Sequence, residues 1–138
     1  MLMIFTHQTT IHFHDADPAG VLFFGRAFTL MHECYEKFIE HLGIPYDEWF
    51  ASSEHVTPIA NAEAQYKKPM LPSKTYDVKM KIIELRESVF KLETEFMDGE
   101  QLHCRIQTLH VFADRTTFKK TKIPQGYYSL FKQALEKI

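Results

Sequence analysis

The sequence predicts an α+β protein: a five-stranded antiparallel sheet wrapped around one long helix, with a short helix near the C-terminus. Two observations support this prediction. Apolar residues recur with helical spacing over one stretch in the first third of the chain, and they alternate with polar residues over several stretches in the second half. The order is one strand, the long helix, four strands and the terminal helix, and the chain after the long helix supplies the apolar face that a sheet packed on this helix needs.

The long helix is predicted from its apolar stripe. Apolar residues follow one another at spacings of three and four from residue 28 to residue 42, namely Phe28, Met31, Tyr35, Phe38 and Leu42. Ala27, Cys34 and Ile39 widen this stripe to about half the circumference. Gly43 follows as a C-terminal cap residue would, so we expect the helix to end there.

The strands are predicted from alternation. A first strand is expected over Phe5–Phe13, and apolar side chains alternate over Tyr76–Ile82, Phe90–Phe96 and Leu102–Thr108. Asp98-Gly99 is a strong hairpin signal between the last two of these runs. Beyond them the apolar parity changes at Leu109 and Val111, which we interpret as a bulge near residues 107–109. A last helix is expected over Tyr127–Ile138.

Length and composition narrow the class of protein. The 138 residues suit a single domain, 1–138, and a 45% hydrophobic content favours a folded globular chain. The net charge of −2 argues against nucleic acid as the main partner. Two cysteines without a framework favour a reducing, cytoplasmic location, and no apolar run is long enough to span a membrane.

The segment Asp15-Ala16-Asp17-Pro18-Ala19-Gly20-Val21 carries the strongest chemical signal. Two acidic residues, a proline and a glycine favour a tight polar loop directly before the long helix. The start of a helix has unpaired N–H groups and the positive end of the helix dipole. A carboxylate facing that end can attack, or activate water against, a carbonyl that the N–H groups polarise. This pattern suits acyl transfer or thioester hydrolysis.

The two aspartates have different expected roles. Asp17 could simply cap the following turn, the commoner role of an aspartate before a helix, or it could be catalytic. For Asp15 we favour a structural role, in which it accepts hydrogen bonds from loop N–H groups and holds Asp17 in place. A metal site is the alternative, because His12 and His14 on a strand would point to one side and Asp15 and Asp17 could complete a zinc or iron ligand set.

The motifs resemble a known family. Asp17-Pro18-Ala19-Gly20-Val21-Leu22-Phe23-Phe24 resembles the active-site loop of hotdog-fold acyl-CoA thioesterases of the 4-hydroxybenzoyl-CoA thioesterase type. Tyr66-Lys67-Lys68-Pro69 with Tyr76-Asp77-Val78, and Val111-Phe112-Ala113-Asp114 with Ile123-Pro124, resemble later strands of that family. Met31–Glu36 and Gln107–Val111 look most like the 1,4-dihydroxy-2-naphthoyl-CoA thioesterases. Gly25 and Ala27 depart from the family pattern, which often has asparagine and tyrosine there.

The resemblance implies a hydrolase that needs no metal or organic cofactor. Asp17 would act as nucleophile or general base, and the backbone N–H of Phe24 or Gly25 would polarise the thioester carbonyl. His32, Tyr35 and Phe23 would line the acyl pocket, although Tyr35 also lies on the apolar stripe, where core packing is its default role. A non-hydrolytic hotdog protein, either a dehydratase or an acyl-CoA binding module, is the other alternative.

Two basic clusters are candidates for binding coenzyme A. One comprises Lys67 and Lys68, and the other comprises Arg115, Lys119, Lys120 and Lys122. They are either solvated turns, the commoner case, or contacts to the phosphates of coenzyme A. Open sheet edges favour pairing between copies of the chain, and the family resemblance implies a homodimer or homotetramer.

Overall fold

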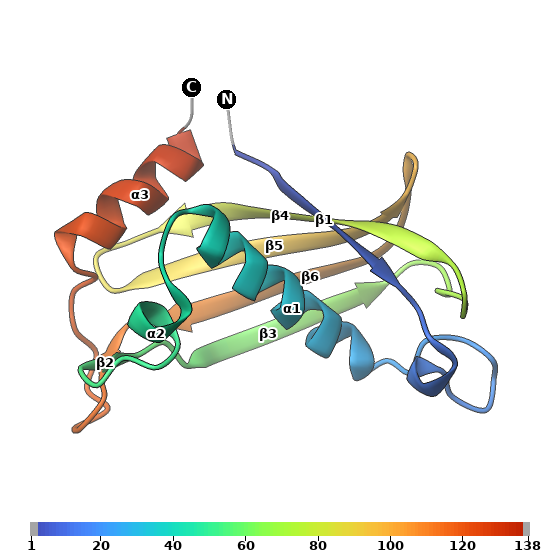
Figure 1. Ribbon diagram of the computed structural model, residues 1–138, viewed down its shortest axis with the longest axis horizontal. Helices are drawn as coiled ribbons and strands as arrows, with labels where there is room; N and C mark the ends of the chain where they lie inside the picture. The colour runs from blue at the N-terminus through green and yellow to red at the C-terminus, as the bar shows by residue number, and fades with distance from the viewer. Residues whose placement is uncertain (1–2, 137–138) are drawn as a thin grey trace.

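The computed structural model describes residues 3–136. The elements follow in the order β1 (Phe5–Thr10), a 3-10 turn (Phe13–Asp15), α1 (Arg26–His41), α2 (Tyr46–Trp49), β2 (His55–Val56), β3 (Ile59–Tyr66), β4 (Thr75–Leu85), β5 (Val89–Asp98), β6 (Gln101–Val111), β7 (Ala113–Asp114) and α3 (Gln125–Glu136). Figure 1 shows α1 lying across one face of the sheet. It shows α3 beside the sheet, where β4 ends and β5 begins.

The main sheet has five antiparallel strands, as predicted, and their order is β1-β4-β5-β6-β3. A separate two-stranded sheet pairs β2 with β7, opposing His55 to Asp114. Gly99 has a φ of +62° in the β5–β6 hairpin, which explains the glycine of the Asp98-Gly99 signal.

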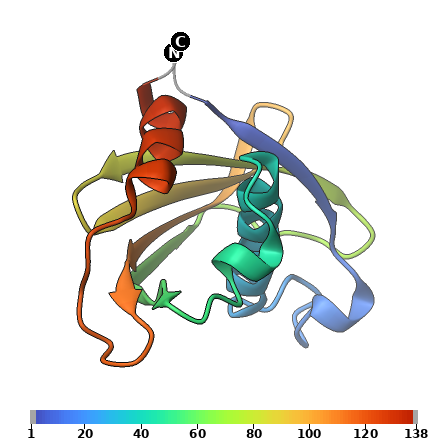
Figure 2. The ribbon, with the colours of Figure 1, turned by 60° about the vertical axis from the view of Figure 1, so that its left-hand side comes forward.

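The sheet curves around α1, which lies in its concavity (Figure 2). Most of the predicted stripe forms the buried face of the helix, although Phe28 and Leu42 at its two ends are only half-buried. The buried residues are Ala27, Leu30, Met31, Cys34, Tyr35, Phe38 and Ile39, of which Leu30 was not predicted. They pack against the alternating residues of the central strands, such as Val78, Leu92 and Ile106. The helix ends as predicted, because Gly43 adopts a φ of +86° and its N–H donates to the Glu40 carbonyl.

Two details differ from the sequence-based expectations. β1 ends at Thr10, not at Phe13, because the Asp15 carboxylate accepts a hydrogen bond from the His12 N–H and turns the chain into the 3-10 turn. The prediction of a bulge at residues 107–109 of β6 is also wrong. Leu109 and Val111 face outward while His110 keeps the inward parity. The extra residue of β6 is His103, since Phe96 pairs with Cys104 and Met97 with Leu102, and another irregularity lies in β3, between Ile59 and Asn61.

The ends of the described chain meet. The Met3 N–H donates to the Ala134 carbonyl at 2.9 Å, so the residues that lead into β1 lie beside the end of α3 (Figure 2). The predicted terminal helix is confirmed, beginning at Gln125; positions 137 and 138 of the expected Tyr127–Ile138 lie outside the described residues. None of the helices within residues 3–136 is long and apolar enough to cross a membrane.

Candidate active site

The loop between the 3-10 turn and α1 is a tight turn centred on Asp17. The Gly20 N–H donates to the Asp17 carbonyl and the Asp17 N–H donates to the Val21 carbonyl, both at 2.9 Å. Gly20 has a φ of +80°, a backbone conformation that glycine adopts without strain. The Asp17 Oδ1 accepts the Ala19 N–H at 2.9 Å, whereas Oδ2 has no hydrogen-bond partner among residues 3–136. Asp17 is half-buried, so one carboxylate oxygen is left to react.

Asp15 anchors this loop from inside. Its side chain is buried, and its Oδ1 accepts from Arg26 Nε at 2.8 Å and lies 2.6 Å from the second guanidinium nitrogen. Its Oδ2 accepts the His12 N–H at 2.9 Å. Burial by itself would raise the pKa of Asp15, but the hydrogen bonds from His12 and Arg26 and the charge of Arg26 outweigh it and lower that pKa. The Asp15 carboxylate therefore accepts the N–H of His12, which precedes the loop, instead of the loop N–H groups that we expected, and Arg26 is a partner that our sequence analysis did not predict.

The start of α1 presents free hydrogen-bond donors. The N–H groups of Leu22 and Phe23 donate to Met70 and Asp15, and those of Arg26 and Ala27 donate to carbonyls of the preceding turn. Between them, the N–H groups of Phe24 and Gly25 have no acceptor within residues 3–136. Two adjacent N–H groups at the positive end of a long helix can stabilise an oxyanion.

A groove of about 340 Å³ runs beside this helix start. Its lining brings together four of the predicted site residues, Asp17, Phe24, Lys67 and Lys68. The other lining residues are Val21, Leu22, Tyr66, Pro69 and Met70. The groove therefore has apolar walls with one carboxylate and two lysines, which suits an apolar acyl thioester that carries anionic phosphates.

Phe24 and Tyr66 line the groove, whereas Phe23, which we expected in the pocket, lies beside Phe24 and is not part of the lining. Phe23 and Phe24 lie with ring centroids 4.8 Å apart, and both are exposed. The Tyr66 hydroxyl donates to the Phe24 carbonyl at 2.6 Å, which ties the helix start to β3. A Cβ at Gly25 would meet the Phe23 ring at 3.0 Å, so the glycine at this position lets the ring lie close to the backbone.

His32 and Tyr35 do not reach this groove within one chain. Tyr35 lies in the core and its hydroxyl accepts the Trp49 Nε1–H at 2.8 Å, which is the packing role that its position on the stripe favours. Burial raises the pKa of the Tyr35 hydroxyl to about 12. His32 is half-buried further along α1, where its Nδ1 lies 3.0 Å from Glu36.

The geometry assumed for the metal alternative is not observed. His12 and His14 follow the strand instead of lying on it, and their rings stack on each other with centroids 5.5 Å apart. Asp15 is bound by Arg26. Within the part of the chain that the structure describes, no group of three or more His, Cys, Asp or Glu side chains has a metal-ligating arrangement.

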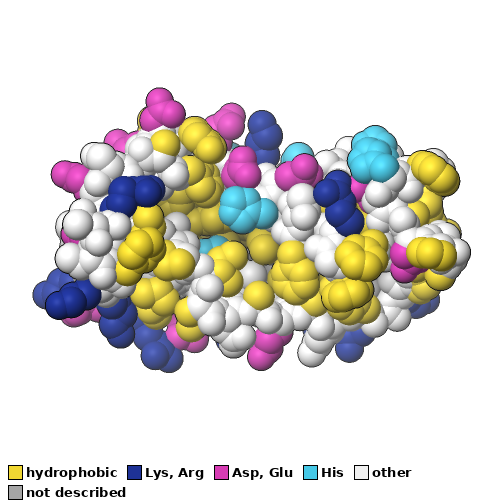
Figure 3. All heavy atoms as spheres, turned by 90° about the horizontal axis from the view of Figure 1, so that it is seen from below, with side chains coloured by type: hydrophobic (Ala, Val, Ile, Leu, Met, Phe, Trp, Pro, Cys, Tyr) yellow, Lys and Arg dark blue, Asp and Glu magenta, His cyan; other side chains and the backbone are white. Residues whose placement is uncertain are grey.

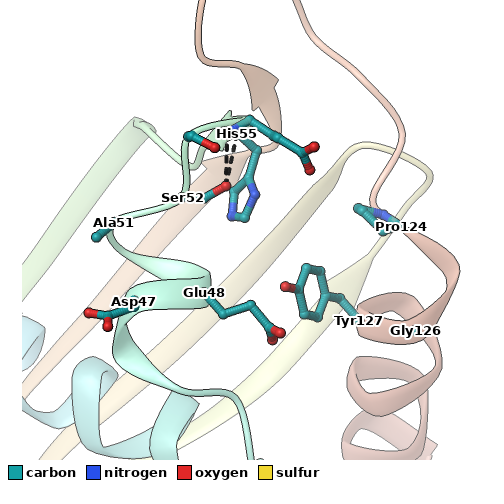
Figure 4. A pocket seen from close by; sticks show the side chains of 10 residues that line it. Asp47, Glu48, Ala51, Ser52, His55, Pro124, Gly126 and Tyr127 are labelled. Atoms are coloured by element: carbon teal, nitrogen blue, oxygen red, sulfur yellow. Dashed lines mark hydrogen bonds between the residues drawn. The ribbon is translucent and has the colours of Figure 1, made fainter.

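A larger hollow, of about 580 Å³, lies near the opposite end of the molecule between α2, β2 and α3 (Figure 4). Asp47, Glu48 and Glu54 make its lining acidic, and His55 and Tyr127 contribute rings. An acidic lining repels the phosphates of coenzyme A, and none of the predicted site residues lies there. The groove beside α1 is therefore the better candidate, although it is the smaller of the two.

Sequence reasoning missed Arg26 and Tyr66 as site residues. Tyr66 directly precedes the two lysines that were singled out, but its contact with Phe24 joins residues 42 positions apart and leaves no local signal. Arg26 follows Gly25 at the helix start, where a basic residue opposes the helix dipole and so indicates a local anionic partner. That unfavourable placement was the available clue to the Asp15 contact.

Comparison with known proteins assigns the fold and the family. The family model described as "Thioesterase-like superfamily" matches residues 11–135. A 1,4-dihydroxy-2-naphthoyl-CoA hydrolase of Thermosynechococcus vestitus is 29% identical over 94% of this chain and 90% of its own. A crystal structure of a gentisyl-coenzyme A thioesterase has a TM-score of 0.82 and 26% identity, covering 91% of this chain and 98% of the other. A 1,4-dihydroxy-2-naphthoyl-CoA thioesterase structure from Synechocystis has a TM-score of 0.86 at 24% identity, covering 94% and 96%.

These matches, together with the loop and the helix start, define the class of protein as a hotdog-fold thioesterase. The chain belongs to the thioesterase-like superfamily. The family resemblance and the hotdog fold inferred from the sequence are thereby confirmed.

Proposed function

We propose that the chain hydrolyses the thioester of an aromatic acyl-CoA, releasing the free acid and coenzyme A. One observation carries this proposal: a carboxylate with a free oxygen, on Asp17, and the unpaired N–H groups at the start of α1 flank one apolar groove. Thioester hydrolysis needs a nucleophile or base on one side of the carbonyl carbon and donors for its oxygen on the other. The order of the residues matches the active-site loop that the sequence resembles.

The chemistry follows from this arrangement. The thioester oxygen would lie at the N–H groups of Phe24 and Gly25, where the positive end of the α1 dipole stabilises the negative charge that develops on it. The Asp17 carboxylate would attack the carbonyl carbon, the C–S bond would break, and water would then hydrolyse the mixed anhydride. Alternatively, Asp17 would take a proton from the attacking water. In both routes one water is consumed and the thiolate gains a proton, without a metal or an organic cofactor.

The lining supports an aromatic acyl group. Val21, Phe24 and Met70 give the groove apolar walls, and Phe23 offers a second ring beside Phe24. Aromatic side chains pack well against the planar ring of a benzoyl or naphthoyl group. The named relatives act on 1,4-dihydroxy-2-naphthoyl-CoA and gentisyl-CoA, which points to a hydroxylated aromatic acid of the 4-hydroxybenzoyl type.

We also propose that the chain forms a homodimer through β3, with a homotetramer as its further assembly. β3 is an edge of the sheet, and only Ala64 among its residues is even half-buried. An unpaired strand of this length invites pairing with a second copy. In Figure 3, which looks onto this side of the molecule, hydrophobic side chains run along much of the face. A cytoplasmic location, where acyl-CoA is made and used, remains our prediction.

The test is a thiol-release assay over a panel of acyl-CoA esters, with light scattering of the same samples. We expect release of coenzyme A without added metal, unchanged by chelator, with aromatic acyl groups preferred over aliphatic ones, and a mass of two or four chains. Activity that disappears on chelation and returns with zinc or iron would contradict the proposed chemistry. An active monomer would contradict the proposed assembly.

A further inference from the structure

One wall of the groove is held in place by a histidine of the sheet. Residues 67–70, which we call the groove wall, follow β3, and all four of them line the groove. Figure 1 shows that the chain leaves β3 and returns as β4 at the end of the sheet where α1 begins. The histidine is His103 of β6, which is buried, with only 8% of its surface exposed. It contacts the groove wall but is not part of the groove lining.

A bulge in β6 gives His103 its unusual placement. His103 is the extra residue of the strand, because Phe96 pairs with Cys104 and Met97 pairs with Leu102. His103 and Cys104 are both buried, whereas successive residues of a regular strand face opposite sides of the sheet. Bulges are frequent next to active sites, where they redirect a side chain. The bulge at His103 therefore indicates that the direction of this side chain matters.

Both the backbone and the ring of His103 bind the groove wall. The His103 carbonyl accepts the Lys67 N–H at 2.8 Å and the Lys68 N–H at 3.1 Å. The Nδ1 atom of the ring lies 2.9 Å from the Pro69 carbonyl oxygen. A carbonyl oxygen can only accept a hydrogen bond, so Nδ1 carries a proton and donates it. His103 thus makes three hydrogen bonds to three successive residues of the wall.

Tyr76 of β4 supports the other end of the groove wall. Its hydroxyl is buried and accepts the N–H of Leu71, the residue after the wall, at 2.9 Å. The Tyr76 ring packs against the His103 ring with centroids 5.0 Å apart and an interplanar angle of 64°. The wall is therefore bound by two side chains of the sheet that also pack on each other.

The groove wall in turn holds the start of α1. The Met70 carbonyl accepts the Leu22 N–H at 2.8 Å. Tyr66, the residue before the wall, donates to the Phe24 carbonyl at 2.6 Å. These two contacts lie directly beside the free N–H groups of Phe24 and Gly25. A shift of the wall would therefore move these donors, and a misplacement of about 1 Å can lower a reaction rate by about 100-fold.

We propose that His103 is a positioning residue for thioester hydrolysis. Its hydrogen bonds set the position of the groove wall, and the bond between Met70 and Leu22 passes this on to the N–H groups at the start of α1. His103 acts through these residues and does not touch the substrate. This inference rests on the proposed function. It requires that activity depends on the Nδ1–H donor, whereas packing against Tyr76 depends on the ring.

Two substitutions separate the hydrogen bond of His103 from its ring. His103→Phe keeps a ring beside Tyr76 but has no donor for the Pro69 carbonyl. His103→Asn loses the ring but has an amide N–H₂ that can take the place of Nδ1–H. Gln101→Ala, at an exposed position of the same strand, is the control.

The first measurement is kcat/KM with the best acyl-CoA of the panel. We expect it to fall about five- to ten-fold in His103→Phe, the effect of one lost hydrogen bond, and to stay within about two-fold of the wild type in His103→Asn and Gln101→Ala. Urea unfolding should rank the variants differently, with His103→Asn less stable than His103→Phe because it lacks the ring. If His103→Asn is instead slower than His103→Phe, activity follows packing and the proposal is overturned.

The second measurement tests the same link without catalysis. The Leu22 N–H is bonded to the Met70 carbonyl, so its hydrogen exchange reports whether the wall holds the segment before α1. We expect this N–H to exchange about ten-fold faster in His103→Phe, the effect of one lost hydrogen bond, and at nearly the wild-type rate in His103→Asn. Unchanged exchange in His103→Phe would overturn the proposed link. If exchange follows the donor but the wild type hydrolyses no acyl-CoA, the proposed function fails and the link between His103 and Leu22 stands.

Discussion

Replacing Asp15 with asparagine tests whether the buried ion pair with Arg26 holds the loop that carries Asp17. The change keeps the size of the side chain but removes the negative charge, which is buried and faces two guanidinium nitrogens and the His12 N–H. Breaking a buried pair from one side typically costs about 3–5 kcal/mol. The Arg26 side chain is 37% exposed and can be rehydrated, and the amide oxygen can still accept one hydrogen bond, so we expect a loss of about 2–3 kcal/mol.

The assay is urea unfolding of both proteins at one concentration, since an oligomer's stability depends on concentration. A loss of this size should lower the urea midpoint by roughly 1–2 M, because the free energy of unfolding falls by about 1–3 kcal/mol per molar urea. The pKa of Asp15 is lowered in the folded state, so its contribution is present above the unfolded-state pKa and disappears as the pH falls through the folded-state value. The difference between the wild type and Asp15→Asn should therefore shrink in acid. Equal stability of the two proteins at pH 7 would refute the anchoring role of Asp15.

Two further predictions concern Tyr66 and His110. Tyr66→Phe removes the hydroxyl that donates to the Phe24 carbonyl. We expect the free energy of unfolding to fall by no more than about 1 kcal/mol and kcat/KM for the acyl-CoA substrate to fall several-fold. Unchanged kinetics would show that this hydrogen bond does not position the helix start. Burial lowers the pKa of His110 to about 3, with a smaller effect of nearby His32. The unfolded chain binds this proton near pH 6.5 and the folded chain does not, so the free energy of unfolding should fall by about 1.4 kcal/mol per pH unit below 6.5. Urea unfolding of His110→Gln should show a flatter pH dependence, and identical slopes would contradict the assignment.

Periodicity made most of the fold predictable. The stripe from Phe28 to Leu42 needed only the helical repeat, and the alternation in β4, β5 and β6 needed only the two-residue repeat of a strand. β3 and the shorter elements were not found in this way. β3 is exposed over nearly its whole length, so its sequence shows no alternation. α2, β2 and β7 are too short for a period to show, and β2 and β7 exist because they pair with each other across a long stretch of chain.

The loop that carries Asp17 was predictable from the sequence because its signal is local. Proline, glycine and aspartate specify the turn of Asp17 and Gly20 within a few residues, and the helix start follows directly. The contact between Tyr66 and Phe24 depends on how β3 packs beside α1, and no local pattern encodes it. The apparent change of parity at Leu109 led to the wrong prediction of a bulge, because burial of a polar residue also leaves no local signal. His110 is buried against Phe90 and Tyr35, but in the sequence a polar residue in the core cannot be told from an exposed one.

The central claim is that the Asp17 carboxylate acts on the thioester, and Asp17→Asn tests it most directly. Asparagine retains an oxygen that can accept the Ala19 N–H, and Asp17 is only half-buried, so stability should stay within about 0.5 kcal/mol of the wild type. With the best acyl-CoA of the panel, turnover measured by thiol release should fall by roughly 10²-fold or more. A folded Asp17→Asn protein that keeps near-wild-type turnover on that substrate would contradict the account.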